Sequence, residues 1–163
     1  MDRKRVQLID RLESSGQDYL WYLDRLSEEE IHVPPAPNEW SVHQIAAHMR
    51  DTERLVFLHR VERMLNEEHP AVDNFDQEAW HREHYVTAEP LRKIKSEFRT
   101  ARRKLARLLR SASKMDWENW AVHPEYGKIS LDWLLEHNYL HTLEHLAQIA
   151  RMRESATLKE LNR

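Results

Sequence analysis

Residues 131–153 read LDWLLEHNYLHTLEHLAQIARMR and carry the clearest helical pattern of the chain. Apolar and small side chains recur there at spacings of three and four residues, which is typical of an amphipathic helix. Ser130 stands directly before the stretch and is a suitable N-cap. The face that we expect to point inward consists of Leu134, Asn138, His141, His145, Gln148 and Met152. An apolar helix face is stable only when other elements bury it, so the pattern predicts further helices that pack against this one.

Two other segments show the same periodicity. Residues 6–26 place apolar or small groups on one face, namely Ile9, Leu12, Gly16, Tyr19, Leu23 and Leu26. Residues 88–113 tolerate Pro90 in a first helical turn. Their expected core face is Leu91, Ile94, Phe98, Ala101, Leu105 and Leu108. Both segments are predicted to be long amphipathic helices.

A fourth helix is predicted from Ser41 to about residue 66. Ser41 and Gln44 have the spacing of a capping box, in which each side chain binds the backbone N–H of the other residue. Three prolines upstream, Pro34, Pro35 and Pro37, separate this helix from the first one. Its expected inward face is Ile45, His48, Thr52, Leu55 and His59.

The remaining segments are connections. Residues 67–87 look irregular, with a short helix that Asp76 caps and that contains Trp80. Residues 114–129 form a second long connection with a turn at Gly127. The last ten residues are expected to be a frayed or short helical tail. Four amphipathic helices bury their faces most simply in an all-α four-helix bundle, and we predict one such domain over residues 1–163.

The composition excludes several classes of function. The chain has 163 residues, a net charge of -3 and no cysteine, so disulfides and thiolate ligands are absent. No apolar stretch resembles a signal peptide or a membrane span, and we therefore expect a cytoplasmic protein. Nine basic residues between Arg92 and Arg110 avoid the predicted apolar face. We expect a solvated helix face there and no binding of nucleic acid or membrane.

The histidines suggest a metal site. His141 and His145 lie four residues apart on the inward face, so their rings stack about 6 Å apart along the axis. His48 has an inward position on the 41–66 helix and can meet them if the two helices pack side by side. Neutral imidazole is the commonest protein ligand for transition metals. The alternative is that these are ordinary buried histidines, each hydrogen-bonded to a neighbour.

Other histidines have weaker roles. His137 is rotated by about 80° from His145 around the helix, which favours a position beside the metal or in the pocket wall over direct ligation. His59 lies too far from His48 for the same ion. His32, His43 and His69 are expected on the surface or in loops. Residues 141–145 also match the His-x-x-Glu-His pattern of inverted zinc proteases. The match is weak because too few residues follow for their third ligand, and Glu144 is expected to face solvent.

Two motifs resemble those of a known family. Trp40-Ser-Val-His-Gln-Ile-Ala-Ala-His48-Met-Arg-Asp51-Thr-Glu53 is similar to the second-helix signature of the DinB-like superfamily. His137-Asn-Tyr-Leu-His141-Thr-Leu-Glu-His145-Leu-Ala-Gln148-Ile149 resembles its fourth-helix signature, and His123-Pro-Glu-Tyr-Gly127 resembles the loop before that helix.

The resemblance implies an antiparallel bundle with a long crossover between the second and third helices, often assembled as a homodimer. It places the metal triad on His48, His141 and His145, in agreement with the geometric reasoning. The family includes bacterial enzymes that use low-molecular-weight thiols, members described as metal-dependent hydrolases, and members of unknown activity. Its name refers to DNA damage, which does not make the fold a DNA binder.

Three protein ligands leave coordination positions open, as in a catalytic metal site. All-histidine ligation suits zinc or nickel, and also copper or iron. Any thiol nucleophile has to be a diffusible cofactor, because the chain has no cysteine. The residues that we expect to orient the ligands are Asp51, Thr52, His137, Asn138 and Gln148. At the mouth of the pocket we expect Trp80, His81, His84, Trp120 and His123, with His84 and His123 as candidate acid–base helpers.

The sequence thus favours a divalent-metal-dependent enzyme that acts on a small-molecule substrate, either a thiol-dependent transferase or a hydrolase. Two alternatives remain at this stage. One is a metal-binding or stress-related protein without turnover. The other is a structural bundle whose histidines hold no metal.

Overall fold

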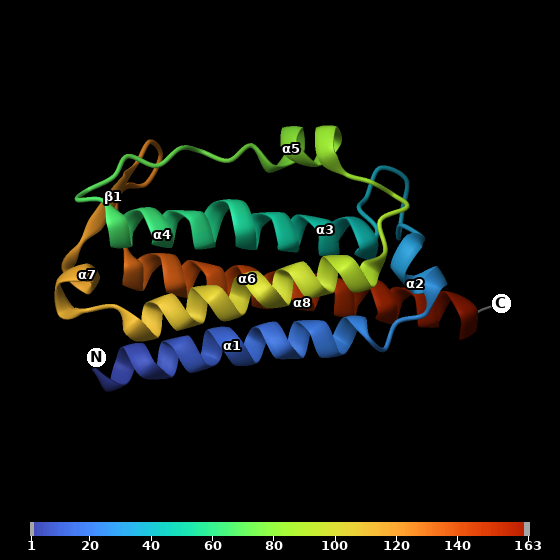
Figure 1. The fold of residues 1–163 in the computed structure, drawn as a ribbon. Coiled ribbons are helices and arrows are strands. Elements are labelled where there is room, and N and C mark those ends of the chain that lie inside the picture. Colours follow the sequence, from blue (N-terminus) through green and yellow to red (C-terminus); the bar gives the residue numbers. More distant parts are fainter. Residues whose placement is uncertain (1, 162–163) are drawn as a thin grey trace.

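Four long helical segments lie side by side in the computed structural model, which describes residues 2–161 (Figure 1). The segments are α1 (Arg3–Leu23), the continuous rod of α3 (Val42–Thr52), η1 (Glu53–Leu58) and α4 (His59–Asn66), then α6 (Leu91–Ser111) and α8 (Leu131–Leu161). Two of them run in each direction, because the long connection between α4 and α6 returns along the bundle before α6 begins (Figure 1). The predicted four-helix bundle and its crossover are confirmed.

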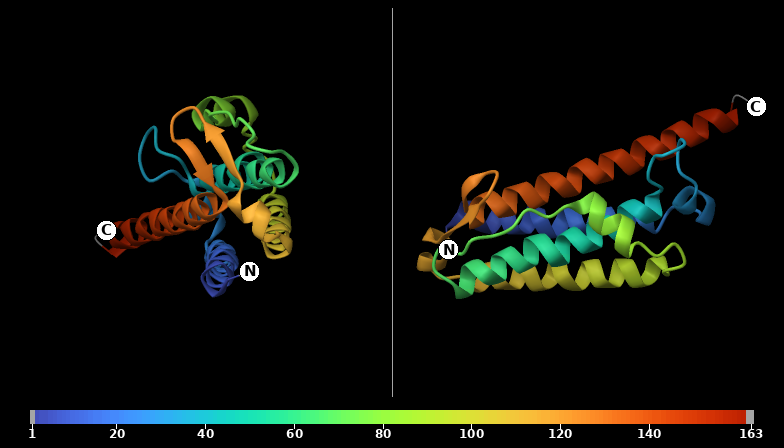
Figure 2. Two further views of the ribbon diagram at one scale, coloured as in Figure 1. Left: turned by 90° about the vertical axis from the view of Figure 1, so that its left-hand side faces the viewer. Right: turned by 90° about the horizontal axis from the view of Figure 1, so that it is seen from above.

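Short elements join these helices. They are α2 (Glu28–His32), α5 (Gln77–His84), α7 (Lys114–Glu118) and the antiparallel hairpin of β1 (Trp120–His123) and β2 (Gly127–Ser130). The hairpin lies in the second predicted connection, and its β2 strand begins at Gly127, where a turn was predicted. Ala71 of the crossover forms a parallel bridge with Val122 of β1. The hairpin and α5 therefore stand on the same side of the bundle (Figure 2).

The predicted helix starts are confirmed at three places. The Ser41 side chain accepts from the backbone N–H of Gln44, and the Gln44 side chain accepts from that of Ser41. Ser130 Oγ accepts from the backbone N–H of Trp133 at 3.1 Å. Asp76 caps α5 through the backbone N–H of Ala79. These caps rest on contacts within one turn, which is why the sequence alone reveals them.

Some helix ends differ from the prediction. α1 begins at Arg3, because Asp2 caps it, and ends at Leu23 before Leu26. α6 begins only after Pro90. α8 does not stop at Arg153 but continues to Leu161, so the predicted tail belongs to this helix, except for its last two residues, which lie outside the described ones. Figure 2 shows α8 extending past the other helices.

The second rod departs from the predicted helical phase. Leu55 and His59 were expected to point inward, yet both are exposed. The cause is η1, a π-helical segment from Glu53 to Leu58. A π turn accommodates one extra residue, so every side chain after it is rotated by about 100° relative to a regular α-helix. The buried side chains from Val56 onward are Val56, Phe57 and Leu58 in η1 and Arg60, Val61 and Met64 in α4.

The core has two apolar parts with a polar layer between them. One part gathers around Leu12, Val61 and Leu105, and the other around Tyr19, Ile45 and Phe98. In α6, buried Arg102 stands between Phe98 of one part and Leu105 of the other. All basic residues of this helix were predicted to face solvent. Leu109, and not the predicted Leu108, is the fully buried leucine near the end of α6.

No helix among the described residues is both long and apolar enough to cross a lipid bilayer.

Candidate metal centre

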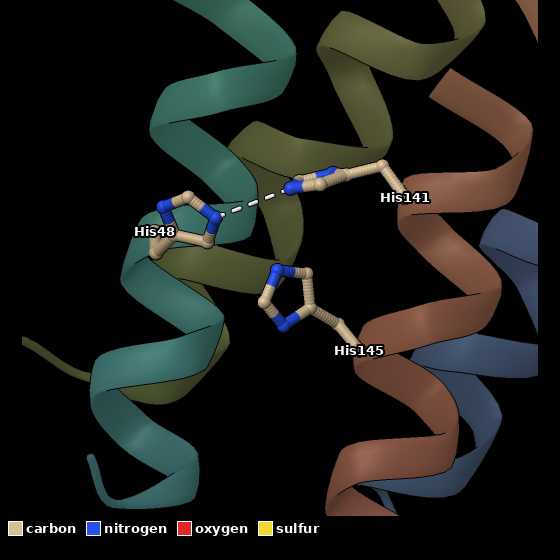
Figure 3. Close-up of side chains that lie close together, drawn as sticks. All are labelled: His48, His141 and His145. Carbon is tan, nitrogen blue, oxygen red and sulfur yellow. Dashed lines mark hydrogen bonds between the residues drawn. The ribbon is translucent and has the colours of Figure 1, made fainter. Parts of the chain in front are cut away.

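Three histidine rings from two helices meet inside the bundle. His48 lies on α3, and His141 and His145 lie on successive turns of α8 (Figure 3). Helical periodicity alone aligns the α8 pair. The meeting with His48 requires α3 and α8 to pack together, although these residues are 93 positions apart in the sequence. This is the cluster that the sequence analysis singled out, and one ring nitrogen from each histidine lies within 4.8 Å of the others.

The spacing of the nitrogens fits a single ion. Tetrahedral zinc with Zn–N bonds of 2.0–2.1 Å separates its ligand nitrogens by about 3.3 Å. Nε2 of His48 and Nε2 of His141 lie 3.2 Å apart. The His145 ring then needs to move inward by at most about 1.5 Å to complete the set. A small side-chain rotation covers that distance, so the donor set fits a divalent transition metal.

The rings are held in the neutral form that binds metals. Burial, together with the neighbouring rings, lowers the pKa of His48 to about 3 and that of His141 to about 2. Burial also lowers the pKa of His145, although a hydrogen bond to Gln148 opposes the shift. At neutral pH no proton therefore has to leave these rings before an ion binds.

Two of the predicted supporting residues hold the outer nitrogens of the ligand rings. Gln148 Oε1 lies 2.8 Å from Nδ1 of His145. Because an amide oxygen only accepts, Nδ1 carries the proton and Nε2 keeps its lone pair for a metal. Thr52 Oγ1 lies 3.3 Å from Nδ1 of His48 and supports the same arrangement there. Such contacts orient the ligands of metal sites.

The other three predicted supporting residues contact different groups. Asp51 accepts from the indole N–H of Trp80 at 3.1 Å and thereby holds α5 over α3. Asn138 is fully buried, but its amide binds the polar layer described below. His137 stacks on Trp133 with ring centroids 4.7 Å apart. His137 thus lies one turn from the cluster and outside it, as its rotation around α8 predicts.

A buried ion pair lies behind the histidines. The Arg102 guanidinium donates from Nε and Nη2 to the two carboxylate oxygens of Glu53 at 2.7 and 2.8 Å. It also donates to Asn138 and Thr142 of α8 and to the backbone carbonyl of Leu12 in α1. The network joins all four long helical segments at the level of His141. The sequence analysis missed it, although Arg102 has helical spacing with Phe98 and Leu105 on the buried face.

A cavity of about 410 Å³ opens beside the cluster. Its walls are Gln77, His141, Glu144, His145, Gln148 and Arg151. Glu144 is exposed as predicted, yet it borders the same cavity as the two α8 histidines. Gln77 comes from the crossover, as expected for one wall of the pocket. The five aromatic residues predicted at the mouth do not line this cavity.

The two candidate acid–base residues, His84 and His123, make their contacts outside the three-histidine cluster. His84 is exposed and stacks on Trp80 with centroids 3.6 Å apart. His123 is buried at the end of β1, where its Nε2 lies 3.2 Å from Nη2 of Arg60. Neither is hydrogen-bonded to a histidine of the cluster.

A second histidine, besides His59, lies where the sequence did not predict it. His43 was expected at the surface, but it is completely buried. Its Nε2 donates to the carbonyl of Glu89, and its Nδ1 accepts from the hydroxyl of Tyr85, both at 2.8 Å. His43 is therefore an ordinary buried histidine with a protein partner at each ring nitrogen, which is the alternative that the sequence left open for the histidines of the cluster. His32 and His69 are exposed as predicted.

Comparisons with known proteins give a consistent result. The sequence model described as the DinB superfamily matches residues 11–149. The structure is similar to YfiT from Bacillus subtilis, "a probable metal-dependent hydrolase with an unusual four-helix bundle topology", with a TM-score of 0.85 and 19% identity over 96% of this chain and 90% of that one. It also resembles TT2238, described as a four-helix bundle protein, with a TM-score of 0.67 and 17% identity over 90% of this chain and 98% of that one. A search of curated proteins finds no match. At these identities the solved structures establish the shared fold.

Proposed function

The chain belongs to the DinB superfamily, and from that premise we propose that it is a metal-dependent enzyme that acts on a small molecule at the three-histidine cluster. One observation carries the proposal. Three neutral imidazoles converge, that of His48 buried and those of His141 and His145 half-buried, and the two α8 rings border an open cavity. Buried polar rings without a shared ion each need their own partner, whereas one ion satisfies all three.

The proposed roles follow from the contacts. His48, His141 and His145 hold a divalent ion, and Thr52 and Gln148 fix two of the rings through Nδ1. A divalent ion with open positions lowers the pKa of a water or thiol that coordinates to it. The carboxylate of Glu144 borders the same cavity and is placed to accept a proton from a bound molecule.

Hydrolysis is the leading reaction class, because the description of YfiT as a probable metal-dependent hydrolase concerns a protein of the same fold. Transfer to a thiol is the second class. The chain has no cysteine, so the thiol in that case comes from a low-molecular-weight cofactor. Zinc and nickel are the metals that best suit a set of three imidazoles.

Metal analysis tests the proposal directly. Untagged protein loaded with zinc or nickel and then desalted should retain about one ion per chain, measured by elemental mass spectrometry. His48→Ala should lose that ion. His59→Ala is the matched control, since this exposed histidine lies on the same rod. A metal-free wild type after loading, or full binding by His48→Ala, would refute the metal centre.

Activity is tested on the loaded protein with a panel of ester and amide substrates, with and without added thiols. We expect turnover that Glu144→Gln lowers and His48→Ala removes. Turnover in the absence of thiols assigns a hydrolase, and turnover only in their presence assigns a transferase. Stoichiometric metal without turnover in either arm would favour a metal-binding protein and contradict the enzyme assignment.

A further inference from the structure

Arg60 is a buried cation without a carboxylate partner. Three arginines among the described residues are buried, namely Arg50, Arg60 and Arg102. Arg50 pairs with Asp51 and Glu89, and Arg102 pairs with Glu53. No described carboxylate lies within 4.0 Å of the Arg60 guanidinium. Burial of an unpaired charge is costly, so the missing counterion needs an explanation.

The contacts of Arg60 leave part of the guanidinium free. Nη2 donates to the backbone carbonyl of Asp73 in the crossover at 2.6 Å and lies 3.2 Å from Nε2 of His123. These two contacts join α4 to the crossover and to the hairpin, which stand at the same end of the bundle (Figure 1). The N–H groups of Nε and Nη1 have no acceptor among the described residues. The Nε–H and Nη1 groups lie on different edges of the guanidinium, so each can donate a single charge-assisted hydrogen bond to an oxygen of a bound anion.

A series of ring contacts leads from His123, which contacts Arg60, to His137 of α8. His123 contacts Tyr126 with ring centroids 4.7 Å apart, and Tyr126 lies 6.3 Å from the ring of His137. The Arg60 charge adds to the effect of burial in lowering the pKa of both His123 and His137. Tyr126 is half exposed and His137 is exposed, so a small solute can approach from their side. The phenol and the imidazole can donate further hydrogen bonds to it.

We propose that Arg60 is the anchor of an anion-binding site that takes the carboxylate or phosphate group of a small molecule, with Tyr126 and His137 at its open side. The bound anion supplies the direct ion-pair partner that no described carboxylate provides, although the more distant Asp73 charge partly compensates Arg60. A merely structural role of Arg60, which is to hold Asp73 and His123, uses only Nη2 and needs no buried charge.

The location links this site to the cluster of histidines. His137 precedes His141 by one turn of α8, or about 6 Å. Phe57 contacts both rings, with centroid distances of 6.1 Å to His137 and 5.8 Å to His141. If the proposed metal centre is correct, on which this step rests, its substrate carries an anionic group on the His137 side of the reacting group.

The test uses metal-free, full-length protein. Inorganic phosphate and succinate are titrated separately at constant ionic strength with chloride as balance, and the Nε–H resonance of Arg60 is followed by ¹⁵N NMR. We expect a saturable shift of this resonance with at least one of the two anions. The arm that saturates at the lower concentration identifies the group as phosphate or carboxylate.

Two variants complete the test. Arg60→Gln should weaken anion binding about tenfold or more, because charge-assisted hydrogen bonds are lost. Arg63→Gln is the matched control: this arginine lies one turn away on α4 and also donates to the crossover, at the carbonyl of Ala71, but it pairs with Glu67. The control should bind as the wild type does. Should Arg60→Gln fail to fold, the wild-type Nε–H titration decides alone.

An Arg60 resonance that does not move, or equal loss of binding in both variants, would overturn the proposal. The titration needs no metal and is repeated with His48→Ala. Failure of the metal centre therefore leaves this test intact, and failure of the anion site leaves the metal analysis intact.

Discussion

Two buried histidines, His43 and His48, have different roles in this protein, and the partners of their ring nitrogens determine the difference. His43 is buried, but both of its ring nitrogens have protein partners. His48 is also buried, yet its Nε2 faces another imidazole. With its proton on Nδ1, beside Thr52, the His48 ring keeps the Nε2 lone pair for a ligand. A buried histidine becomes a ligand candidate when its neighbours leave such a lone pair unsatisfied.

The depressed pKa values predict acid sensitivity of the metal-free protein. Burial lowers the pKa of His48 and His141 below the value of 6.5 that applies to the unfolded chain. Below that pH the unfolded chain takes up protons that the folded protein does not, so the free energy of unfolding falls as the pH falls. Each such histidine contributes a slope of up to about 1.4 kcal/mol per pH unit, and its full stabilisation is present above pH 6.5. Denaturant unfolding between about pH 7.5 and 5 measures the slope.

Replacement of one titrating ring should reduce that slope. We expect His141→Gln to unfold with a shallower pH dependence than the wild type. His59→Gln removes an exposed histidine and should leave the slope unchanged. Equal slopes in the wild type and in His141→Gln would show that this ring is not held neutral by the fold.

At the scale of elements, the π-helical segment sets the phase of the second rod. Because of η1, His48 before it, Phe57 within it and Arg60 after it all lie on the buried side. A regular α-helix of the same sequence would instead turn Leu55 and His59 inward. Glu53, the first residue of η1, provides the carboxylate for Arg102. The π-helical turn thus provides the carboxylate of the polar layer and keeps His48 and Arg60, one from each candidate site, on the buried side of the rod.

Deletion of Leu55 tests this interpretation. A π turn is equivalent to an α-helix with one inserted residue, and Leu55 is exposed within it. Its removal should convert η1 to a regular helix and keep the residues on both sides on their present faces. We expect the variant to retain its helical circular dichroism and the stoichiometric metal binding of the wild type.

The matched control is deletion of Arg103, an exposed residue in the regular helix α6. This deletion rotates Leu105 and Leu109 by about 100° away from the core and should abolish cooperative unfolding. If both deletions unfold the protein, η1 is not a simple insertion and the phase argument fails.

At the scale of the whole molecule, the bundle topology brings distant segments together. The crossover makes α3 and α4 run in the same direction as α6, and it places α5 beside α3 (Figure 1). The candidate metal centre joins α3 to α8, and Arg102 joins the four long helical segments behind it. An ion at this point connects segments that the chain itself separates by most of its length.

Metal should therefore stabilise the entire fold. A ligand that binds only the folded state at about 100 times its Kd adds about 2.7 kcal/mol, which corresponds to about 5–10 °C in Tm for a domain of this size. Thermal unfolding with and without zinc measures the shift, and a chelator should reverse it. His48→Ala should show no shift; a rise equal to that of the wild type would place the stabilising ion elsewhere.

Local patterns in the sequence determined much of this protein. The helical periodicity, the caps at Ser41, Asp76 and Ser130, and the pairing of His141 with His145 depend on contacts within one or two turns. The inward position of His48 on the 41–66 helix pointed to the third ligand, and the family motifs agreed. These features are readable because side chains three or four residues apart share a helical face in any surroundings.

Only the tertiary structure decided the rest. One extra residue in η1 changes the phase of the rod, and no period in the sequence reveals it. Arg102 and Arg60 look like solvated basic residues until their long-range partners, Glu53 in one case and the crossover and hairpin in the other, are in place. The physical reason is that burial of a charge depends on neighbours that are distant in the chain, whereas helical periodicity depends on neighbours that are close.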